Sequence, residues 1–287
     1  MKIRLTILNL ARATTSRWPF RGRARLEKIA VLSLGLSGHL VNLEVATGLS
    51  IRVDIANRVE GTMYFRRYEP DVLKLFAEVL SEGDVAVDIG ANVGFTAAMM
   101  AKSVGKSGTI HCFEPGSVPF KRLARFADDA NANGYQIVTY NMGASHEKST
   151  VQMNTSKSDN PGWLTMVPGL MSEASFSHAE TIEVNRVDEL LIEANITPKL
   201  VKIDVEGAEL GVIKGLTALF DKKILPTIIC EVAPNAYPYL GFDLDYLFDL
   251  MSKFGYVPTD TFGEPITSNS FQGTTNIIWR QPVGSSN

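Results

Sequence analysis

The chain has 287 residues, of which 45% are hydrophobic and 21% charged, an ordinary composition for a globular protein with a large core. This composition excludes a disordered chain, a collagen-like repeat and a disulfide-rich scaffold. The formal charge of −3 hides an uneven distribution. The first 38 residues carry eight Lys or Arg and a single acid, Glu27, whereas the other 249 residues carry 20 basic and 30 acidic groups.

The basic N-terminal segment has no pattern of a membrane span. Its longest strongly apolar stretch, Ile29–Leu36, is far shorter than the roughly 20 residues that cross a bilayer. Arg4 and Arg12 interrupt the opening apolar run, so we expect no cleaved secretory signal. We expect a basic helix that packs on the body or makes peripheral contact with an anionic membrane surface. Cys112 and Cys230 lie in short apolar runs, which predicts free core thiols and a cytoplasmic protein.

Two patterns follow in chain order. Residues 39–55 form two alternating β-branched runs around Ala-Thr-Gly at positions 46–48, which predicts a β-hairpin. From Pro70 the apolar residues recur at helical spacing, and residues 81–84 end that helix. We therefore divide the chain into an N-terminal helix and hairpin appendage, residues 1–69, and an α/β body, residues 70–287.

The body alternates strand and helix patterns, which predicts a parallel sheet. The expected strands are Val85–Ile89, Thr109–Phe113, Ile137–Tyr140, Leu200–Val205, Ile228–Val232, Tyr256–Pro258 and Thr275–Trp279. The expected helices are Thr96–Lys102, Pro119–Asn131, Val187–Glu193, Glu209–Phe220 and Leu244–Phe254, the last capped by Asp243.

Residues 145–180 break the alternation. The segment is rich in Ser, Thr, Asn and Met without clear periodicity, which is typical of a lid or a binding loop. His146 and His178 flank it and would approach a site beneath it. Trp163, together with Tyr237, is a candidate apolar surface for an acceptor, with packing under the loop as the alternative.

Four acidic residues stand where strands are expected to end: Asp88, Glu114, Asp204 and Glu231. In an open parallel sheet, ligands bind beyond the carboxyl ends of the strands, especially where the strand order reverses. These carboxylates therefore predict a cofactor or substrate site at that edge. The alternative is that they cap helices or turns.

The loop after the first strand reads Asp-Ile-Gly-Ala-Asn-Val-Gly over residues 88–94. Gly90 and Gly94 permit a tight turn and close approach of a ligand, and Asn92 tolerates a left-handed conformation. Asn92 and Phe95 stand where a dinucleotide fingerprint has glycine, so that fingerprint fits poorly.

Glu114 lies 24 residues beyond Gly90, the distance at which a carboxylate meets a nucleoside ribose. The first loop has no basic residue for a phosphate. The pattern therefore favours a nucleoside with a cationic or neutral tail, such as S-adenosylmethionine.

Leu200–Gly207 alternates charged and apolar residues, although a central parallel strand is normally apolar. A period of two would send Lys202, Asp204 and Glu206 to one face. Buried charges must be paired, so these three are paired, exposed in the crevice or functional. The alternative is an edge strand with one wet face.

Four runs together resemble the FkbM-like methyltransferases: Val-Asp-Ile-Gly-Ala-Asn-Val-Gly (87–94), Phe-Glu-Pro (113–115), Lys-Ile-Asp-Val-Glu-Gly-Ala-Glu-Leu (202–210) and Ile-Cys-Glu-Val (229–232). The resemblance covers about residues 68–256. It implies a Rossmann-like, seven-stranded class I fold that uses S-adenosylmethionine. It also implies a cofactor site: Asp88, Gly90, Ala91, Asn92 and Gly94 around the methionine part, Glu114 and Pro115 at the ribose, and Asn141, Gly143 and Ala144 near the adenine.

The charged strand end supplies the candidate catalytic residues. Asp204 and Glu206 are the candidate bases for an acceptor hydroxyl, because a positioned carboxylate can remove its proton. Lys202 would keep one of them ionised or contact an anionic acceptor, and Glu231 would join the pocket floor. Two carboxylates can hold a divalent metal, but no histidine joins them in sequence and we predict no metal.

The favoured function is O-methylation of a hydroxyl on a sugar, glycan precursor or related small molecule. An NAD-dependent oxidoreductase or epimerase would explain the sheet and Glu114 but not Asn92 or the charged strand. A non-catalytic nucleoside-binding module is the third alternative. Nucleic acid is disfavoured as a partner because the body is acidic and has no recognised stacking motif. The sequence does not indicate an oligomeric state.

Overall fold

The structure is a computed structural model that describes residues 2–17, 22–36, 38–156, 164–165, 167, 176–270 and 273–282. The chain divides into two compact units, residues 1–70 and residues 71–287. Within the described ranges, no helix combines the length and apolar character needed to cross a bilayer.

In its described residues the first unit contains the predicted hairpin and three helices. Its elements are α1 (Lys2–Arg17), α2 (Arg23–Ser33), β1 (Leu40–Ala46), β2 (Leu49–Asp54) and α3 (Arg58–Tyr64). β1 and β2 pair antiparallel, and Gly48 takes a φ of +75° in the turn between them, as the Ala-Thr-Gly signal predicts. Asn57 caps α3, because its side chain accepts the main-chain N–H groups of Val59 and Glu60.

The second unit is built on the expected seven-stranded, mostly parallel sheet. Its strands are β3 (Val85–Ile89), β4 (Thr109–Phe113), β5 (Ile137–Tyr140), β10 (Leu200–Ile203), β11 (Thr227–Val232), β12 (Val257–Thr259) and β13 (Thr275–Arg280). Their order is β12-β13-β11-β10-β3-β4-β5, with β13 antiparallel to both of its neighbours. The first three strands begin and end at the predicted residues.

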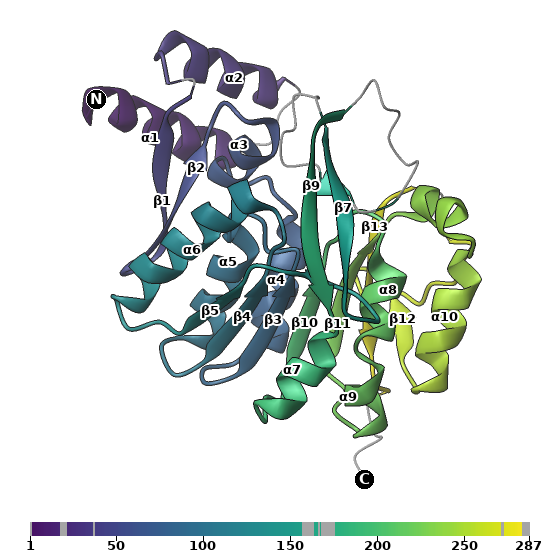
Figure 1. Cartoon of the computed structure of the whole chain (residues 1–287). Helices are drawn as coiled ribbons and strands as arrows, with labels where there is room; N and C mark the ends of the chain where they lie inside the picture. The colour runs from purple at the N-terminus through teal and green to yellow at the C-terminus, as the bar shows by residue number, and fades with distance from the viewer. Residues whose placement is uncertain are drawn as a thin grey trace. The chain divides into compact units, whose positions relative to one another are not determined.

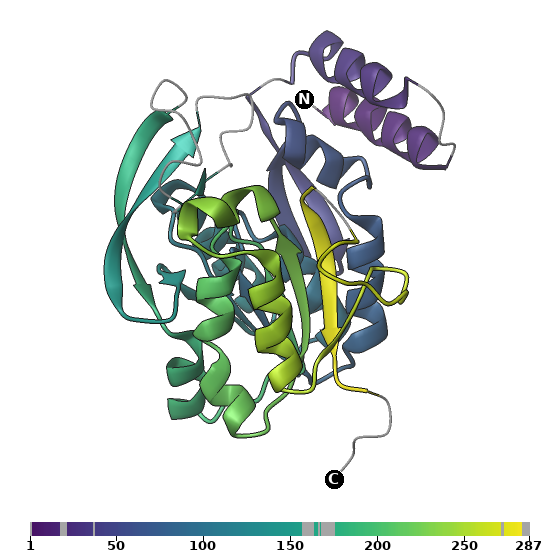
Figure 2. The ribbon, with the colours of Figure 1, turned by 90° about the vertical axis from the view of Figure 1, so that its right-hand side faces the viewer.

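Helices cover both faces of this sheet (Figures 1 and 2). They are α4 (Pro70–Val79), α5 (Phe95–Val104), α6 (Ser117–Asn131), α7 (Val187–Glu193), α8 (Glu209–Lys214), α9 (Thr217–Asp221) and α10 (Leu244–Lys253), together with the 3-10 helix η2 (Pro234–Leu240). Asp243 caps α10 as predicted, accepting the N–H of Tyr246. The predicted helix Glu209–Phe220 is wrong in one respect: it is interrupted at Gly215, where a Cβ would lie 2.0 Å from the Ser145 carbonyl oxygen.

The strand order reverses between β3 and β10. From β3 the chain builds outward through β4 and β5, and it then crosses back to add β10 and β11 on the other side of β3. The carboxyl ends of β3 and β10 therefore flank the switch point, the place where ligands bind in open α/β sheets. Asp88 lies in β3, and Asp204 directly follows β10.

Two expectations about the middle of the chain are wrong. The insertion at residues 145–180 is not wholly irregular, because β6 (Gly143–Ala144), β7 (Ser149–Ser156), β8 (Leu164–Thr165) and β9 (Phe176–Asn185) form a second sheet. Figure 2 shows the β7–β9 ribbon separate from the main sheet. The charged strand, moreover, ends at Ile203 and is central, lying between β11 and β3. Because Asp204 and Glu206 lie beyond the end of β10, the strand does not carry all three charges on one face. Because it is central, the alternative of an edge strand is also wrong.

Candidate functional site

The loop after β3 turns sharply under the end of β4. Gly90 and Ala91 donate their main-chain N–H groups to the Phe113 carbonyl oxygen at 2.9 and 3.0 Å. Gly90, Asn92 and Gly94 have φ values of +85°, +49° and +92°, so the left-handed conformation expected at Asn92 is confirmed. A Cβ on Gly90 would lie 1.8 Å from the Asp204 carbonyl oxygen. The glycine is therefore required by the close approach of the loop after β10.

Asp88 is fully buried below this loop. Its Oδ2 accepts a 2.6 Å hydrogen bond from the Thr96 hydroxyl, which ties β3 to the first turn of α5. Among the described residues its Oδ1 has no hydrogen-bond partner. Burial raises the pKa of Asp88, and attraction to Lys202 opposes that rise. Through this hydrogen bond Asp88 stabilises the two ends of the loop, β3 and the first turn of α5.

Glu114 receives two main-chain N–H groups. Asn92 donates to Oε2 at 2.8 Å and Gly116 to Oε1 at 2.7 Å. A carboxylate offers about four acceptor positions, so one on each oxygen remains for the two hydroxyls of a ribose. Burial raises the pKa of Glu114 to about 7, although the two N–H groups favour the charged form.

The residues predicted near the ribose and adenine fall into two groups. The exposed Asn141 donates from Nδ2 to the carbonyl oxygens of Glu114 at 3.0 Å and Pro115 at 3.1 Å, so it braces the loop that carries Glu114. Gly143 and Ala144 are buried in β6, where they pair with β9. The structure therefore brings Asn141 to the loop that carries Glu114, whereas Gly143 and Ala144 are part of the second sheet.

Lys202 and Asp204 form an ion pair at the end of β10. Lys202 Nζ lies 2.8 Å from Asp204 Oδ2, and the Lys202 side chain is 2% exposed. Burial raises the pKa of Asp204, but attraction to Lys202 and hydrogen bonds with Glu231 and Lys202 outweigh it, so the pKa lies below its usual value. Asp204 is consequently a carboxylate at neutral pH.

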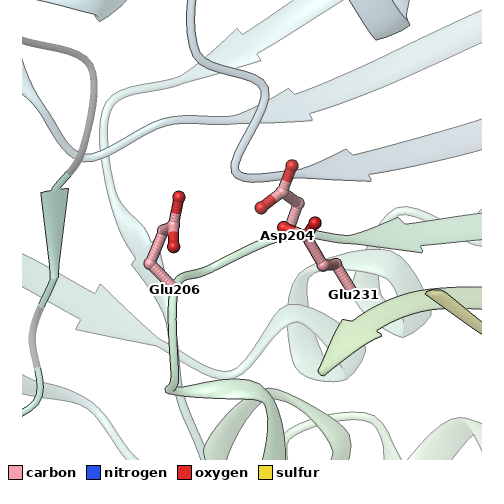
Figure 3. A group of neighbouring side chains, drawn as sticks. All are labelled: Asp204, Glu206 and Glu231. Atoms are coloured by element: carbon pink, nitrogen blue, oxygen red, sulfur yellow. The ribbon is translucent and has the colours of Figure 1, made fainter. Parts of the chain in front are cut away.

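Asp204, Glu206 and Glu231 converge at the switch point. One carboxylate oxygen from each lies within 4.8 Å of the others, and all three side chains are partly exposed. Figure 3 shows Asp204 and Glu231 beside one another at neighbouring strand ends, with Glu206 farther along the loop. Oxygen ligands at such spacing suit a hard divalent cation, but the neighbouring Lys202 already offsets one negative charge.

Three further residues contact the loop after β10 and the start of α6. The buried Glu209 accepts the Gly207 N–H at 2.6 Å, and burial raises its pKa to about 7. Thr165 in β8 donates to the Glu206 carbonyl oxygen at 2.9 Å, and Glu180 in β9 accepts the Ser117 N–H at 3.2 Å. Glu209 belongs to the run over residues 202–210 that resembles the FkbM family, so the sequence pointed to its neighbourhood. No local sequence pattern marks Thr165 or Glu180.

Other sequence candidates lie elsewhere. Tyr237 is 1% exposed and packs in the core, so the expectation that it forms an acceptor surface is wrong, whereas Trp163 falls outside the described residues. His146 is exposed and 3.4 Å from the Ser145 hydroxyl, and the side chain of His178 is not among those described.

The family model described as the methyltransferase FkbM domain matches residues 88–258, more than half of the chain. The chain belongs to the FkbM methyltransferase family. The matched residues begin at the buried Asp88 and include both the loop after β3 and the carboxylate cluster. S-adenosylmethionine is its cofactor.

Two curated relatives resemble this FkbM domain. The hexuronic acid methyltransferase AglP of Haloferax volcanii is 30% identical over 152 residues, 53% of this chain and 57% of AglP. Methyltransferase 1 of Beauveria bassiana is 28% identical over 151 residues, 45% of this chain and 57% of that protein. The chain thus spans little more than half the length of these relatives.

Among solved structures, the methyltransferase FkbM from Methylobacillus flagellatus aligns with 91% of this chain and 72% of its own, at 15% identity and a TM-score of 0.47.

The residues at the switch point fit S-adenosylmethionine. Glu114 keeps acceptor positions for ribose hydroxyls, and the turn from Gly90 to Gly94 brings main-chain groups to the same edge. The first loop contributes no cation that would select a phosphate.

Proposed function

We propose that this protein transfers the methyl group of S-adenosylmethionine to a hydroxyl group of a sugar or glycan precursor. One observation carries the proposal: three carboxylates converge at the switch point, where the loop after β10 meets the loop after β3. The similarity to a hexuronic acid methyltransferase supports a sugar as acceptor.

A sugar hydroxyl is a weak nucleophile at neutral pH, so a positioned base accelerates the transfer by taking its proton as the new C–O bond forms. Bound S-adenosylmethionine supplies an electrophilic methyl group and leaves as a neutral thioether. The chain's own contribution is then to hold the hydroxyl in line and to accept its proton.

Asp204 and Glu206 divide this work. The pKa of Asp204 lies below its usual value, despite burial, because attraction to Lys202 stabilises its charge. Asp204 is therefore a poor base but a permanent hydrogen-bond acceptor. Glu206 is partly exposed on the loop after β10, and the ion pair at the end of that strand joins Lys202 to Asp204. We assign orientation of the hydroxyl to Asp204 and proton acceptance to Glu206.

In this proposal Lys202 stabilises the Asp204 carboxylate and does not bind the acceptor. Its ammonium group is buried against Asp204, so it is not available to a negatively charged acceptor group. Three carboxylates at the pocket also repel an anion. The acceptor therefore presents an uncharged hydroxyl region to the cluster, and any carboxylate of the sugar lies away from it.

The experiment is a transfer assay with methyl-labelled S-adenosylmethionine and a panel of neutral sugars, hexuronic acids and glycan precursors. The product is then treated with mild alkali, which hydrolyses a methyl ester on a hexuronic carboxylate but leaves a methyl ether intact. We expect an alkali-stable label. An alkali-labile label would show that a carboxylate is methylated, and no transfer to any sugar, with cofactor binding intact, would contradict the sugar acceptor.

A further inference from the structure

The two N-terminal helices expose apolar side chains outside the active site. The exposed fractions are 48% for Ile7 and 69% for Leu10 on α1, and 52%, 52% and 58% for Leu26, Ile29 and Leu32 on α2. Single exposed apolar residues are normal on a protein surface, but a row of them along one helix is not.

The exposed row on α2 is distinct from the side that packs inside its own unit. Val31 and Glu27 are buried on that inner side. Leu26, Ile29 and Leu32 recur every three residues, a spacing that places them along one outer side of the helix. Helix α2 therefore has a buried inner side and, apart from it, an exposed apolar row.

The charges around this row have one sign. Arg25 and Lys28 are exposed beside it on the same helix. The only acid among residues 1–38, Glu27, is 2% exposed and bonded to Arg23 at 2.7 Å and Arg67 at 2.8 Å. The Glu27 carboxylate is therefore neutralised by Arg23 and Arg67 and does not offset the charges of Arg25 and Lys28.

We propose that the α2 outer surface, formed by Arg25, Leu26, Lys28, Ile29 and Leu32, binds an anionic lipid surface. A helix that lies in the membrane interface buries its apolar side chains at the headgroup boundary, while flanking Lys and Arg contact anionic headgroups. The α2 outer surface contains both parts, and the binding is peripheral.

The charge pattern favours lipid over other occupants. Two copies of the chain meeting through this surface would bring Arg25 and Lys28 of one copy near the same cations of the other, which is unfavourable. A nucleic acid would satisfy the two cations but would leave three aliphatic side chains without an apolar partner and without aromatic stacking.

The test is co-sedimentation of the full chain with phosphatidylcholine vesicles and with vesicles that also contain phosphatidylglycerol. We expect sedimentation with the anionic vesicles only, and weakening as salt is raised. Replacing Leu26, Ile29 and Leu32 by Gln, a good helix former, should lower the partition at least about tenfold, as should Arg25→Glu with Lys28→Glu. Phe262→Gln and Lys74→Glu change an exposed apolar and an exposed basic residue of the second unit and should leave the partition unchanged.

Several results would overturn the proposal. They are no sedimentation at low salt, equal binding to both vesicle types, or loss of binding in the control variants as large as in the α2 variants. Dimerisation that the Gln variants abolish, without vesicle binding, would assign the surface to a second copy instead. Helix content by circular dichroism confirms that each variant is folded, and the single variant Leu32→Gln should lower the partition by itself if the triple variant is unstable.

Discussion

The hydroxyl of Thr165 donates a 2.9 Å hydrogen bond to the main-chain carbonyl oxygen of Glu206 and accepts the N–H of Val167 at 3.1 Å. Thr165 is 1% exposed and belongs to the second sheet, whereas Glu206 lies at the switch point with a φ of +51°. A residue other than glycine rarely adopts this left-handed backbone without external support. The insertion therefore stabilises the conformation that presents the Glu206 carboxylate.

Thr165→Val should slow methyl transfer while cofactor binding is retained. The change removes the hydroxyl that bonds the partly buried Glu206 carbonyl and the buried Val167 N–H, and the loss at the buried N–H costs about 1–3 kcal/mol. We expect kcat to fall about tenfold or more, because this free energy supports the catalytic conformation of Glu206. Thr165→Ser keeps the hydroxyl and should restore most of the rate. Equal loss of kcat in both variants would contradict the role of the hydrogen bond.

Glu206→Gln and Asp204→Asn should separate the two proposed roles. Glu206→Gln removes the proton acceptor and should lower kcat by about 10²–10⁴-fold at neutral pH. Asp204→Asn keeps a hydrogen-bond acceptor but leaves the buried Lys202 without its carboxylate, so stability should also fall, by about 3–5 kcal/mol. Steady-state kinetics, cofactor titration calorimetry and urea unfolding distinguish these outcomes. Glu147→Gln, at an exposed residue of the insertion, is the matched control; normal turnover of Glu206→Gln would rule out the proposed base.

The strands of the main sheet follow directly from the sequence, whereas those of the insertion do not. β3 and β4 are short, almost continuously buried and mostly apolar runs, so their limits are visible locally. β7 and β9 carry many Ser, Thr and Glu residues and bury a small cluster formed by Met153, Ile182 and Val184. Their pairing joins segments about 30 residues apart, and no local periodicity predicts it.

The acidic residues of the site were also predictable, but their geometry was not. Strand ends placed Asp88, Glu114, Asp204 and Glu231 at one edge of the sheet. The period-two argument for Glu206 failed because β10 ends before it and the chain turns through φ values of +51° and +109° at Glu206 and Gly207. Thr165 could not be predicted, since a buried threonine far along the chain has no distinguishing local pattern.

Cofactor affinity should depend on pH through Glu114. The pKa of this carboxyl is raised to about 7, and the ribose hydroxyls of S-adenosylmethionine donate to its ionised form. The dissociation constant should therefore rise as pH falls through about 7, by roughly tenfold between pH 8 and pH 6. Titration calorimetry measures this slope. Glu114→Gln should bind more weakly with a flat pH profile, and an unchanged slope in that variant would assign the titration to another group.

The raised pKa of Glu114 also predicts that, without cofactor, the free energy of unfolding falls as pH rises, whereas cofactor affinity increases with pH. A carboxyl whose pKa rises from 4.5 to about 7 on folding binds more protons in the folded state across that window, so stability falls as pH rises through it. The contribution of Glu114 is about 3 kcal/mol. Glu114→Gln should therefore gain stability relative to the native sequence between pH 5 and pH 8 in urea unfolding. The difference between the two proteins isolates Glu114 from Glu209, whose pKa is also raised to about 7.

Activity should not require a divalent metal. Lys202 Nζ is 2.8 Å from Asp204 Oδ2 and supplies a positive charge next to the carboxylate cluster. We expect full turnover after dialysis against EDTA and no stimulation by added Mg²⁺, Mn²⁺ or Ca²⁺. Loss of activity with EDTA that Mg²⁺ restores would instead make Asp204, Glu206 and Glu231 a metal site.

Gly90→Ala should disrupt the junction between the two loops at the switch point. The new Cβ would lie 1.8 Å from the Asp204 carbonyl oxygen, and the residue has a φ of +85°. Left-handed backbone alone costs about 1–2 kcal/mol in a residue other than glycine. Gly241→Ala is the matched control, because Gly241 has a φ of +73° and, among the described residues beyond its chain neighbours, no atom lies within 4 Å of a Cβ there. We expect Gly241→Ala to lower the free energy of unfolding by only about that amount. Gly90→Ala should cost at least several kcal/mol or prevent folding, since the main chain of the β10 loop would have to move. Equal losses in urea unfolding would show that the backbone conformation, and not the contact with Asp204, requires glycine at position 90.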